Sequence, residues 1–439
     1  MLGTVILLLL ISIELVFIVL GFLKYNNFKK EKAIVRIGLF VLFLLLSLVG
    51  VIKFGFQWYG LFLLLLIQTI FATITIVKKK ENTEVKRGKT IFRGINRLIL
   101  TFFTLFPLLV FPQYKPIKVT GEYDINTVSY TLTDTSRDET FTKEVDNRKI
   151  TIQFWYPSDS NGEVLNQKFP LVVFSHGAFG FRLSNYSTYA ELASNGYIVV
   201  SIDHTYHAFY SNQEDGNVVI ANMDFINSAM GAQNGDITGK ESFDLEQEWM
   251  DIRTKDMSFV INHINEKVST NTEGVYSAID IEKIGLMGHS MGGATAAKLG
   301  RDIEGIDAVI VIDGTMLGEK TGFVDGKDVI RNDEYTTPLL NIYGESHYEE
   351  ALKNKDNYPN MIAHKNGVDS YQVVINGATH MNFTDLPIVS PFLNGLVELE
   401  ESKIDARECI ETTNSVILEF FNKYLKEENI VIEKERTFK

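Results

Sequence analysis

The 439-residue chain has one cysteine, Cys409, and only eight histidines. A single cysteine closes no intramolecular disulfide, and without Cys/His clusters the sequence shows no sign of a structural zinc site. It also has no internal repeat and no low-complexity tract. We therefore predict no metal and no organic cofactor.

Basic charge is scarce outside the first quarter of the chain. The formal net charge is −13, of which residues 1–115 contribute +11 and the remainder −24. A strongly acidic domain is not expected to bind nucleic acid or to adhere electrostatically to an anionic bilayer. We therefore expect no nucleic-acid partner and look for a membrane anchor elsewhere in the chain.

Long apolar segments fill the first 113 residues. They cover 5–23, 34–51, 61–77 and 95–111. Each is about as long as a helix that crosses roughly 30 Å of hydrocarbon. We predict a membrane region at 1–113 with about four transmembrane helices. The first has no basic residue before it and no cleavage site after it, so we expect it to be retained. Glu14, inside it, should face another helix rather than lipid.

The orientation follows from the lysine and arginine residues, which concentrate in the first and third loops of this region. Such loops are usually cytoplasmic. With four spans, everything after Pro112 then lies outside the cell. The fourth segment has Asn96 and Arg97 at its start and Pro107 near its end; if it does not cross, the following domain is cytoplasmic. We predict a multi-pass protein of the cell membrane with an extracellular domain.

The remaining chain alternates short β-branched runs with helical patterns. We predict a linker and domain entry at 114–145, a catalytic domain at 146–428 and a C-terminal tail at 429–439. The expected strands are 150–155, 171–174, 197–202, 284–287, 308–312, 339–343 and 371–375, and the clearest helices are 245–264, 291–299 and 415–425. This alternation predicts an α/β fold with a mostly parallel sheet covered on both faces. Residues 206–239 form a long insertion, either a lid or an ordinary mobile loop.

The motif Gly288-His289-Ser290-Met291-Gly292 stands between an apolar run and a helical pattern. This arrangement is typical of a nucleophile elbow, in which a strained turn exposes a serine hydroxyl to an imidazole and a substrate carbonyl. The alternative is an ordinary glycine-rich turn before a helix. We predict that Ser290 is the nucleophile.

Partners for Ser290 are expected beyond the carboxyl ends of the parallel strands. Asp313 and His380 each follow a predicted strand, and the order Ser290, Asp313, His380 is that of an α/β-hydrolase. His380 would take the serine proton, and Asp313 would hold the imidazole. Glu345, after the next strand, is the alternative acid.

An oxyanion hole needs two backbone N–H groups. Met291, directly after the nucleophile, is the first candidate. Ala178, in the His-Gly turn that follows strand 171–174, is the second. We interpret His176 as a brace for that turn and His204 as structural.

These motifs together resemble the platelet-activating-factor acetylhydrolase family of lipases. The resemblance rests on the stretches 169–177, 186–187, 192–197, 203–204, 288–295, 312–314 and 377–385. It implies an α/β-hydrolase that cleaves carboxylic esters, with short or oxidised phospholipid acyl groups as substrates, and it favours Asp313 over Glu345 as the acid. Cutinase-like hydrolases share the elbow but usually have Asp where this chain has His347.

We therefore expect a membrane-anchored serine hydrolase of lipid or other carboxylic esters. One alternative is an acyltransferase that uses the same triad. Another is a membrane sensor or scaffold with a silent hydrolase domain.

Overall fold

The computed structural model describes residues 2–270, 273–398 and 400–439. The chain divides into two compact units. The first, here called the helical unit, is Met1–Lys115 together with Leu386–Val397. The second, here called the sheet unit, is Pro116–Asp385 together with Glu398–Lys439.

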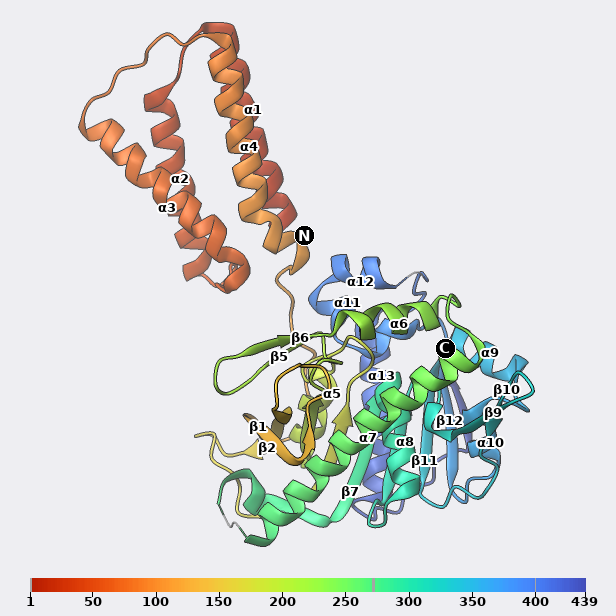
Figure 1. Ribbon diagram of the computed structural model, residues 1–439. Helices are drawn as coiled ribbons and strands as arrows, with labels where there is room; N and C mark the ends of the chain where they lie inside the picture. The colour runs from red at the N-terminus through yellow and green to blue at the C-terminus, as the bar shows by residue number, and fades with distance from the viewer. Residues whose placement is uncertain (1, 271–272, 399) are drawn as a thin grey trace. The chain divides into compact units, whose positions relative to one another are not determined.

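Four long helices make up most of the helical unit: α1 (Leu2–Lys24), α2 (Lys29–Leu48), α3 (Phe56–Val77) and α4 (Arg87–Val110). Helix α1 packs along α4, and α2 packs along α3 (Figure 1). Their core contains Phe43, Trp58, Leu61 and Leu105, all at most 4% exposed. By length and composition α1, α3 and α4 could each cross a membrane. Helix α2 is not among them because its first eight residues carry five charges.

Two short helices, α11 (Leu386–Val389) and α12 (Pro391–Val397), also belong to the helical unit. Helix α12 packs against α4 and against α11. The Ser390 hydroxyl donates a hydrogen bond to the Val110 carbonyl, and the ring of Phe392 lies 6.3 Å from that of Phe106. The helical unit therefore takes in a segment that follows His380 in the chain.

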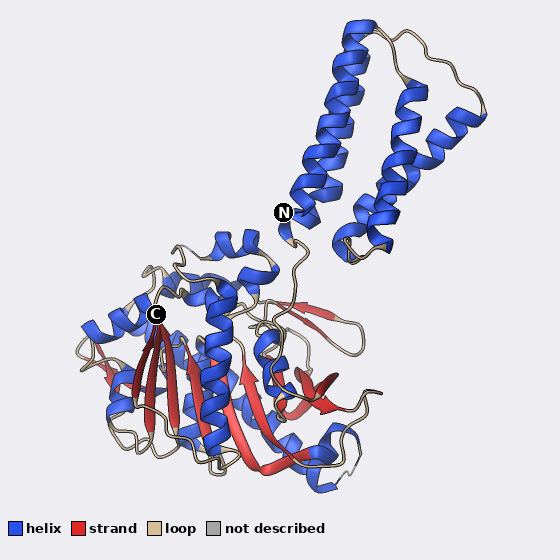
Figure 2. Ribbon diagram, turned by 180° about the vertical axis from the view of Figure 1, so that it is seen from behind, coloured by secondary structure: helices blue, strands red, loops and turns tan. Residues whose placement is uncertain are grey.

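The sheet unit is built on nine strands in the order β1-β2-β4-β3-β7-β8-β11-β12-β13 (Figure 2). Strands β1 and β4 pair antiparallel with β2, and the other neighbours are parallel. The strands are β1 (Asp124–Asp138), β2 (Asn147–Ser158), β3 (Phe169–Ser175), β4 (Ile198–Asp203), β7 (Ile279–His289), β8 (Ala308–Ile312), β11 (Leu339–Gly344), β12 (Ser370–Ile375) and β13 (Glu435–Phe438). Two small hairpins lie outside it: β5 (Tyr210–Asn212) with β6 (Val218–Ile220), and β9 (Lys320–Val324) with β10 (Lys327–Ile330).

Helices cover both faces of this sheet. One core joins the sheet to α7 (Gly239–Thr270), α8 (Met291–Asp302) and α10 (Pro359–Lys365). The other joins it to α5 (Tyr186–Ser194) and α13 (Ala406–Tyr424). The remaining helices are α6 (Met223–Gln233) and α9 (Glu345–Lys353), with 3₁₀ turns at Gly274–Ala278, Leu317–Glu319 and His380–Phe383.

The predicted α/β class is confirmed, and all seven expected strands lie in the sheet. The boundaries differ. The predicted linker 114–145 contains β1, which pairs along β2, and the predicted tail 429–439 contains β13, which pairs with β12. Residues 386–397, predicted inside the catalytic domain, belong to the helical unit because they pack on α4.

Candidate active site

Ser290 occupies a strained turn between β7 and α8. Its φ is 55°, in the left-handed region that non-glycine residues rarely adopt, and its N–H donates to the Ile312 carbonyl at 2.8 Å. The turn tolerates no side chain at Gly292, where a Cβ would lie 1.9 Å from the Ser175 carbonyl oxygen. The glycine therefore brings the nucleophile turn against the end of β3, and Ser290 remains partly exposed.

Asp313 directly follows β8 and is only 3% exposed. Its Oδ1 accepts hydrogen bonds from the Gly344 N–H at 2.7 Å and from His347 Nδ1 at 2.9 Å. Its Oδ2 accepts one from His380 Nδ1 at 2.6 Å. Burial alone would raise the pKa of Asp313, but His347 and His380 hold that pKa well below its usual range. The carboxylate is therefore ionised at neutral pH.

His380 begins the 3₁₀ turn after β12, which Thr379 and Asn382 close with a reciprocal capping box. Burial would lower the pKa of His380, but the hydrogen bond and the charge of Asp313 outweigh it and raise the pKa above its ordinary value. The imidazole side chain is 39% exposed, so a substrate can reach it.

His289 links the nucleophile turn to the His380 turn. Its ring centroid lies 4.4 Å from that of His380, and its Nε2 lies 3.1 Å from the His380 carbonyl. Burial lowers the pKa of His289 to about 3, so its ring is neutral. Within the described residues no hydrogen bond joins the Ser290 hydroxyl to His380, so that link of the triad stays a prediction; such bonds often tighten only when substrate binds.

Glu345, the alternative acid, is placed differently. Its Oε2 accepts from the Gly377 N–H and from Lys403 Nζ, each at 3.2 Å. The structure therefore brings Asp313, and not Glu345, against the imidazole of His380.

The two predicted oxyanion donors contribute to one apolar cluster. Met291 lies in it with Phe225, Trp249 and Ala294, and Ala178 packs against it. The loop that carries Ala178 passes close to the nucleophile, because a Cβ on Gly177 would lie 3.1 Å from the Ser290 Cβ. Met291 thus follows the nucleophile directly, and Gly177, the residue before Ala178, lies against it; the role of both N–H groups stays a prediction.

A buried polar network supports that loop. His204 Nε2 lies 2.8 Å from the Ser175 hydroxyl, and His204 Nδ1 lies 3.1 Å from Asp256 Oδ2. All three side chains are fully buried, and burial lowers the pKa of His204 to about 4. Arg148 pairs with Asp256 at 2.8 Å. This second Ser-His-Asp set is closed to solvent, as the structural interpretation of His204 requires.

Arg253, from α7, anchors the same loop and is fully buried. Its guanidinium donates to the carbonyls of His176 and Gly177. His176 Nδ1 lies 2.6 Å from the Gly177 carbonyl, so this buried ring also braces the turn. His207 is buried too, with its ring stacked on Phe225 at 3.8 Å.

The insertion at 206–239 has regular structure, the β5–β6 hairpin and helix α6 (Figure 1). The N–H of Phe209 donates to the Gly180 carbonyl, which ties the hairpin to the Ala178 loop. Phe209, Val218, Ile220 and Met223 are each at least 60% exposed. An apolar surface therefore lies on the segment that adjoins this loop.

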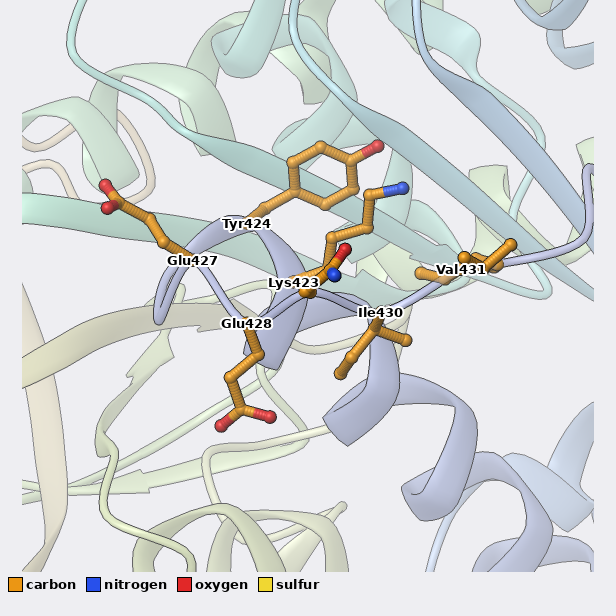
Figure 3. A pocket seen from close by; sticks show the side chains of 8 residues that line it. Lys423, Tyr424, Glu427, Glu428, Ile430 and Val431 are labelled. Atoms are coloured by element: carbon orange, nitrogen blue, oxygen red, sulfur yellow. The ribbon is translucent and has the colours of Figure 1, made fainter.

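Across 2–270, 273–398 and 400–439, no three His, Cys, Asp or Glu side chains gather where they could hold a metal ion. A hollow of about 620 Å³ at the end of α13 is lined by Lys423, Tyr424 and residues 427–432 (Figure 3). Tyr424 donates to Asp369, just before β12, so the hollow adjoins the amino end of that strand, whereas Ser290, Asp313 and His380 follow carboxyl ends.

Nothing in the sequence indicated that His347 and Tyr358 lie near Asp313. His347 was noted only as a departure from the cutinase pattern, yet it holds Asp313 while its Nε2 lies 2.6 Å from the Tyr358 hydroxyl. The burial of Asp256 and Arg253 could not be predicted from the sequence, because charged residues in a long helix usually mark its solvated face.

The strand order and the strained serine after a central strand define an α/β-hydrolase. A similar fold occurs in a ferulic acid esterase from Streptomyces cinnamoneus, with a TM-score of 0.53, 20% identity, and coverage of 71% of this chain and 93% of that one. At that identity the likeness concerns the fold alone.

The chain belongs to the platelet-activating factor acetylhydrolase family, because the family model for isoform II of that enzyme matches residues 132–435. The platelet-activating factor acetylhydrolase of Bos taurus is 26% identical over 278 residues, which cover 59% of this chain and 58% of the relative. That of Gallus gallus is 26% identical over 291 residues, 61% and 65% of the two chains. A probable 1-alkyl-2-acetylglycerophosphocholine esterase of Arthroderma benhamiae is 29% identical over 165 residues, 37% and 35% of the two chains. The match thus spans less than two thirds of these relatives.

Proposed function

We propose that this protein is a serine hydrolase of carboxylic esters. The observation that carries the proposal is the strained Ser290 turn beside a histidine whose Nδ1 is bound to a buried, ionised carboxylate. Membership of the acetylhydrolase family supports the same activity.

The reaction follows from the roles of these groups. His380 Nε2 removes the Ser290 proton as Oγ attacks the ester carbonyl carbon, and the N–H groups of Met291 and Ala178 bind the resulting oxyanion. His380 then protonates the leaving alcohol, which leaves the acyl group on Ser290. Water, activated in the same way, releases the acid and restores the serine. Because His380 acts as a base only when neutral, activity falls as the pH drops through its raised pKa.

The substrate class we propose is a lipid ester with a short acyl group. The apolar cluster of Phe225, Trp249 and Met291 contains one oxyanion candidate and packs against the other, so apolar side chains border the expected position of the ester. One relative is named as an acetylhydrolase and another as a probable 1-alkyl-2-acetylglycerophosphocholine esterase, and both names support a short acyl group. The exposed apolar side chains of 209–223 suit contact with a lipid surface.

We further propose that the helical unit anchors the protein in the cell membrane as a multi-pass region, with the catalytic domain outside. Three apolar helices and lysine-rich loops at 24–32 and 78–93 support this topology. It requires that α2 also crosses, with its charged first turns at the membrane surface. If α2 stayed on one side, the two lysine-rich loops would lie on opposite sides of the membrane, against the usual charge bias.

The test is hydrolysis of p-nitrophenyl esters, from acetate to palmitate, by the full chain in detergent and by its Ser290→Ala variant. We expect turnover of short esters that the substitution abolishes. A maximum at long chains would instead indicate a lipase. No Ser290-dependent hydrolysis would refute the proposal and favour acyl transfer to another alcohol or a silent sensor domain.

A further inference from the structure

Three charged side chains from three helices meet inside the helical unit. Arg36 of α2 lies 3.5 Å from one oxygen of Glu14 in α1, and Arg97 of α4 lies 3.6 Å from the other. The Glu14 and Arg36 side chains are only 13% and 16% exposed. Arg36 is seven residues into α2 and Arg97 ten into α4, about 10 Å and 15 Å along their helices. The cluster thus lies well below the lysine-rich loops.

Positive charge exceeds negative charge in this cluster. Among the described residues, Glu14 is the only side chain that pairs with Arg36 or Arg97. Both distances exceed the roughly 2.7–2.9 Å of a strong charge-assisted bond. Lys32 is also nearby, with its ammonium 5.2 Å from the centroid of the Phe17 ring. One carboxylate therefore faces two loosely held guanidinium groups, which have donors left for a second anion.

A pocket adjoins the cluster. Glu14 and Arg36 line it together with the polar Gln68 and Thr101, and its other walls are apolar side chains such as Phe17 and Leu39. The free space in it is about 20 Å³, enough for one water-sized oxygen. One anionic oxygen beside Arg36, carried on an acyl chain that lies along the apolar helices outside the pocket, matches this lining. Arg97 does not line the pocket and joins the cluster through Glu14.

We propose that Arg36 and Arg97 bind the oxyanion of a membrane lipid. The ligand chemistry is an oxygen anion carried on an acyl chain, either the phosphate of an anionic phospholipid or the carboxylate of a free fatty acid. Glu14 pairs with both guanidinium groups and leaves each of them with free donors. Basic pockets between membrane helices on the cytoplasmic side commonly bind anionic head groups. The inference rests on the proposed membrane location of these helices, and it is independent of ester hydrolysis.

The experiment uses the full-length Ser290→Ala protein in neutral detergent, so that lipid binding does not depend on turnover. Native mass spectrometry measures the binding of palmitoyl-oleoyl phosphatidylglycerol, of oleate and of palmitoyl-oleoyl phosphatidylcholine. We expect an anionic lipid to bind at least ten-fold more tightly than the phosphatidylcholine. The stronger of the phosphatidylglycerol and oleate arms identifies the oxyanion. Equal binding of all three would overturn the proposal.

Three variants of the cluster and one control variant assign the site. Arg36→Gln and Arg97→Gln should each weaken anionic binding at least ten-fold, whereas Lys79→Gln, an exposed loop lysine, should not. Glu14→Gln breaks the ion pairs but keeps both guanidinium groups, so binding should persist even if the variant is less stable. Loss of binding in Glu14→Gln, or unchanged binding in Arg36→Gln, would contradict the proposal. Carbonate extraction of the membranes reports separately whether the helices are integral.

Discussion

Replacing His347 with phenylalanine removes one of the three hydrogen bonds that hold the Asp313 carboxylate. The donors that remain are the Gly344 N–H and His380 Nδ1. The ring of His347 packs edge-on to Tyr343 and Tyr358, where a phenyl ring can take its place. The change is therefore chemical rather than steric.

The magnitude follows from the hydrogen bond. A bond to a charged group contributes about 1.5–3 kcal/mol, but Asp313 is ionised in both the free enzyme and the transition state, so part of this cancels. We expect a transition-state loss of about 1.4 kcal/mol, which is about ten-fold in kcat/KM. Without the His347 hydrogen bond, the negative charge of Asp313 acts more strongly on His380 and should raise the pKa of His380 further.

The assay is the pH profile of kcat/KM with p-nitrophenyl acetate. Because His380 must be neutral, its acid limb should move to higher pH in His347→Phe. Tyr358→Phe removes only the hydroxyl that contacts His347 Nε2. It should move the acid limb to higher pH by a smaller amount. A His347→Phe profile that is merely lower, with an unmoved acid limb, would refute the electrostatic role and leave a packing role.

The His347→Phe substitution should also lower the stability of the folded protein. The pKa of Asp313 is lowered in the folded protein, so its ionised form contributes stability above the unfolded pKa of about 3.9, and this contribution is lost as the pH falls toward the folded pKa. His347→Phe should therefore lower the melting temperature at pH 7, with a difference that shrinks in acid. An equal difference at pH 3 and pH 7 would contradict this account.

Other substitutions test the remaining parts of the site. Asp313→Asn should lower kcat by about 10⁴-fold. Glu345→Gln should change kcat less than about three-fold, because the ion pair of Glu345 with Lys403 lies at the surface. The reverse ranking would make Glu345 the acid. Gly177→Ala places a methyl group against Ser290 and should lower kcat about 10²-fold with an unchanged circular dichroism spectrum; wild-type turnover would show that the loop is not near the reacting carbonyl. Phe209→Ser combined with Ile220→Ser should slow hydrolysis of esters in vesicles at least about ten-fold, since burying one such side chain contributes about 1.5–3 kcal/mol, and should affect dissolved esters less; equal effects on both would argue against lipid contact.

The central strands could be predicted from the sequence because they are buried on both faces. Such strands appear as continuous runs of Val, Ile and Leu, as in 171–174 and 308–312. The two edge strands could not. Strand β1 is rich in Thr, Ser and Asp, and β13 has the sequence Glu-Arg-Thr-Phe, so neither carries an apolar run.

Part of the site was visible in the sequence for a similar reason. Ser290, Asp313 and His380 each follow a strand whose carboxyl end faces the same edge of the sheet. His347 could not be placed, because its contact with Asp313 depends on how α9 leaves β11. The packing of 386–397 on α4 was also hidden, since it depends on contacts between segments about 280 residues apart in the chain.

Covalent labelling of the full-length protein by a fluorophosphonate, with mass spectrometry of the labelled peptide, tests the central claim most directly. The account predicts a single adduct on Ser290, absent from Ser290→Ala and strongly slowed in an otherwise folded His380→Gln. An adduct on another residue, or a folded protein that takes up no label, would contradict it.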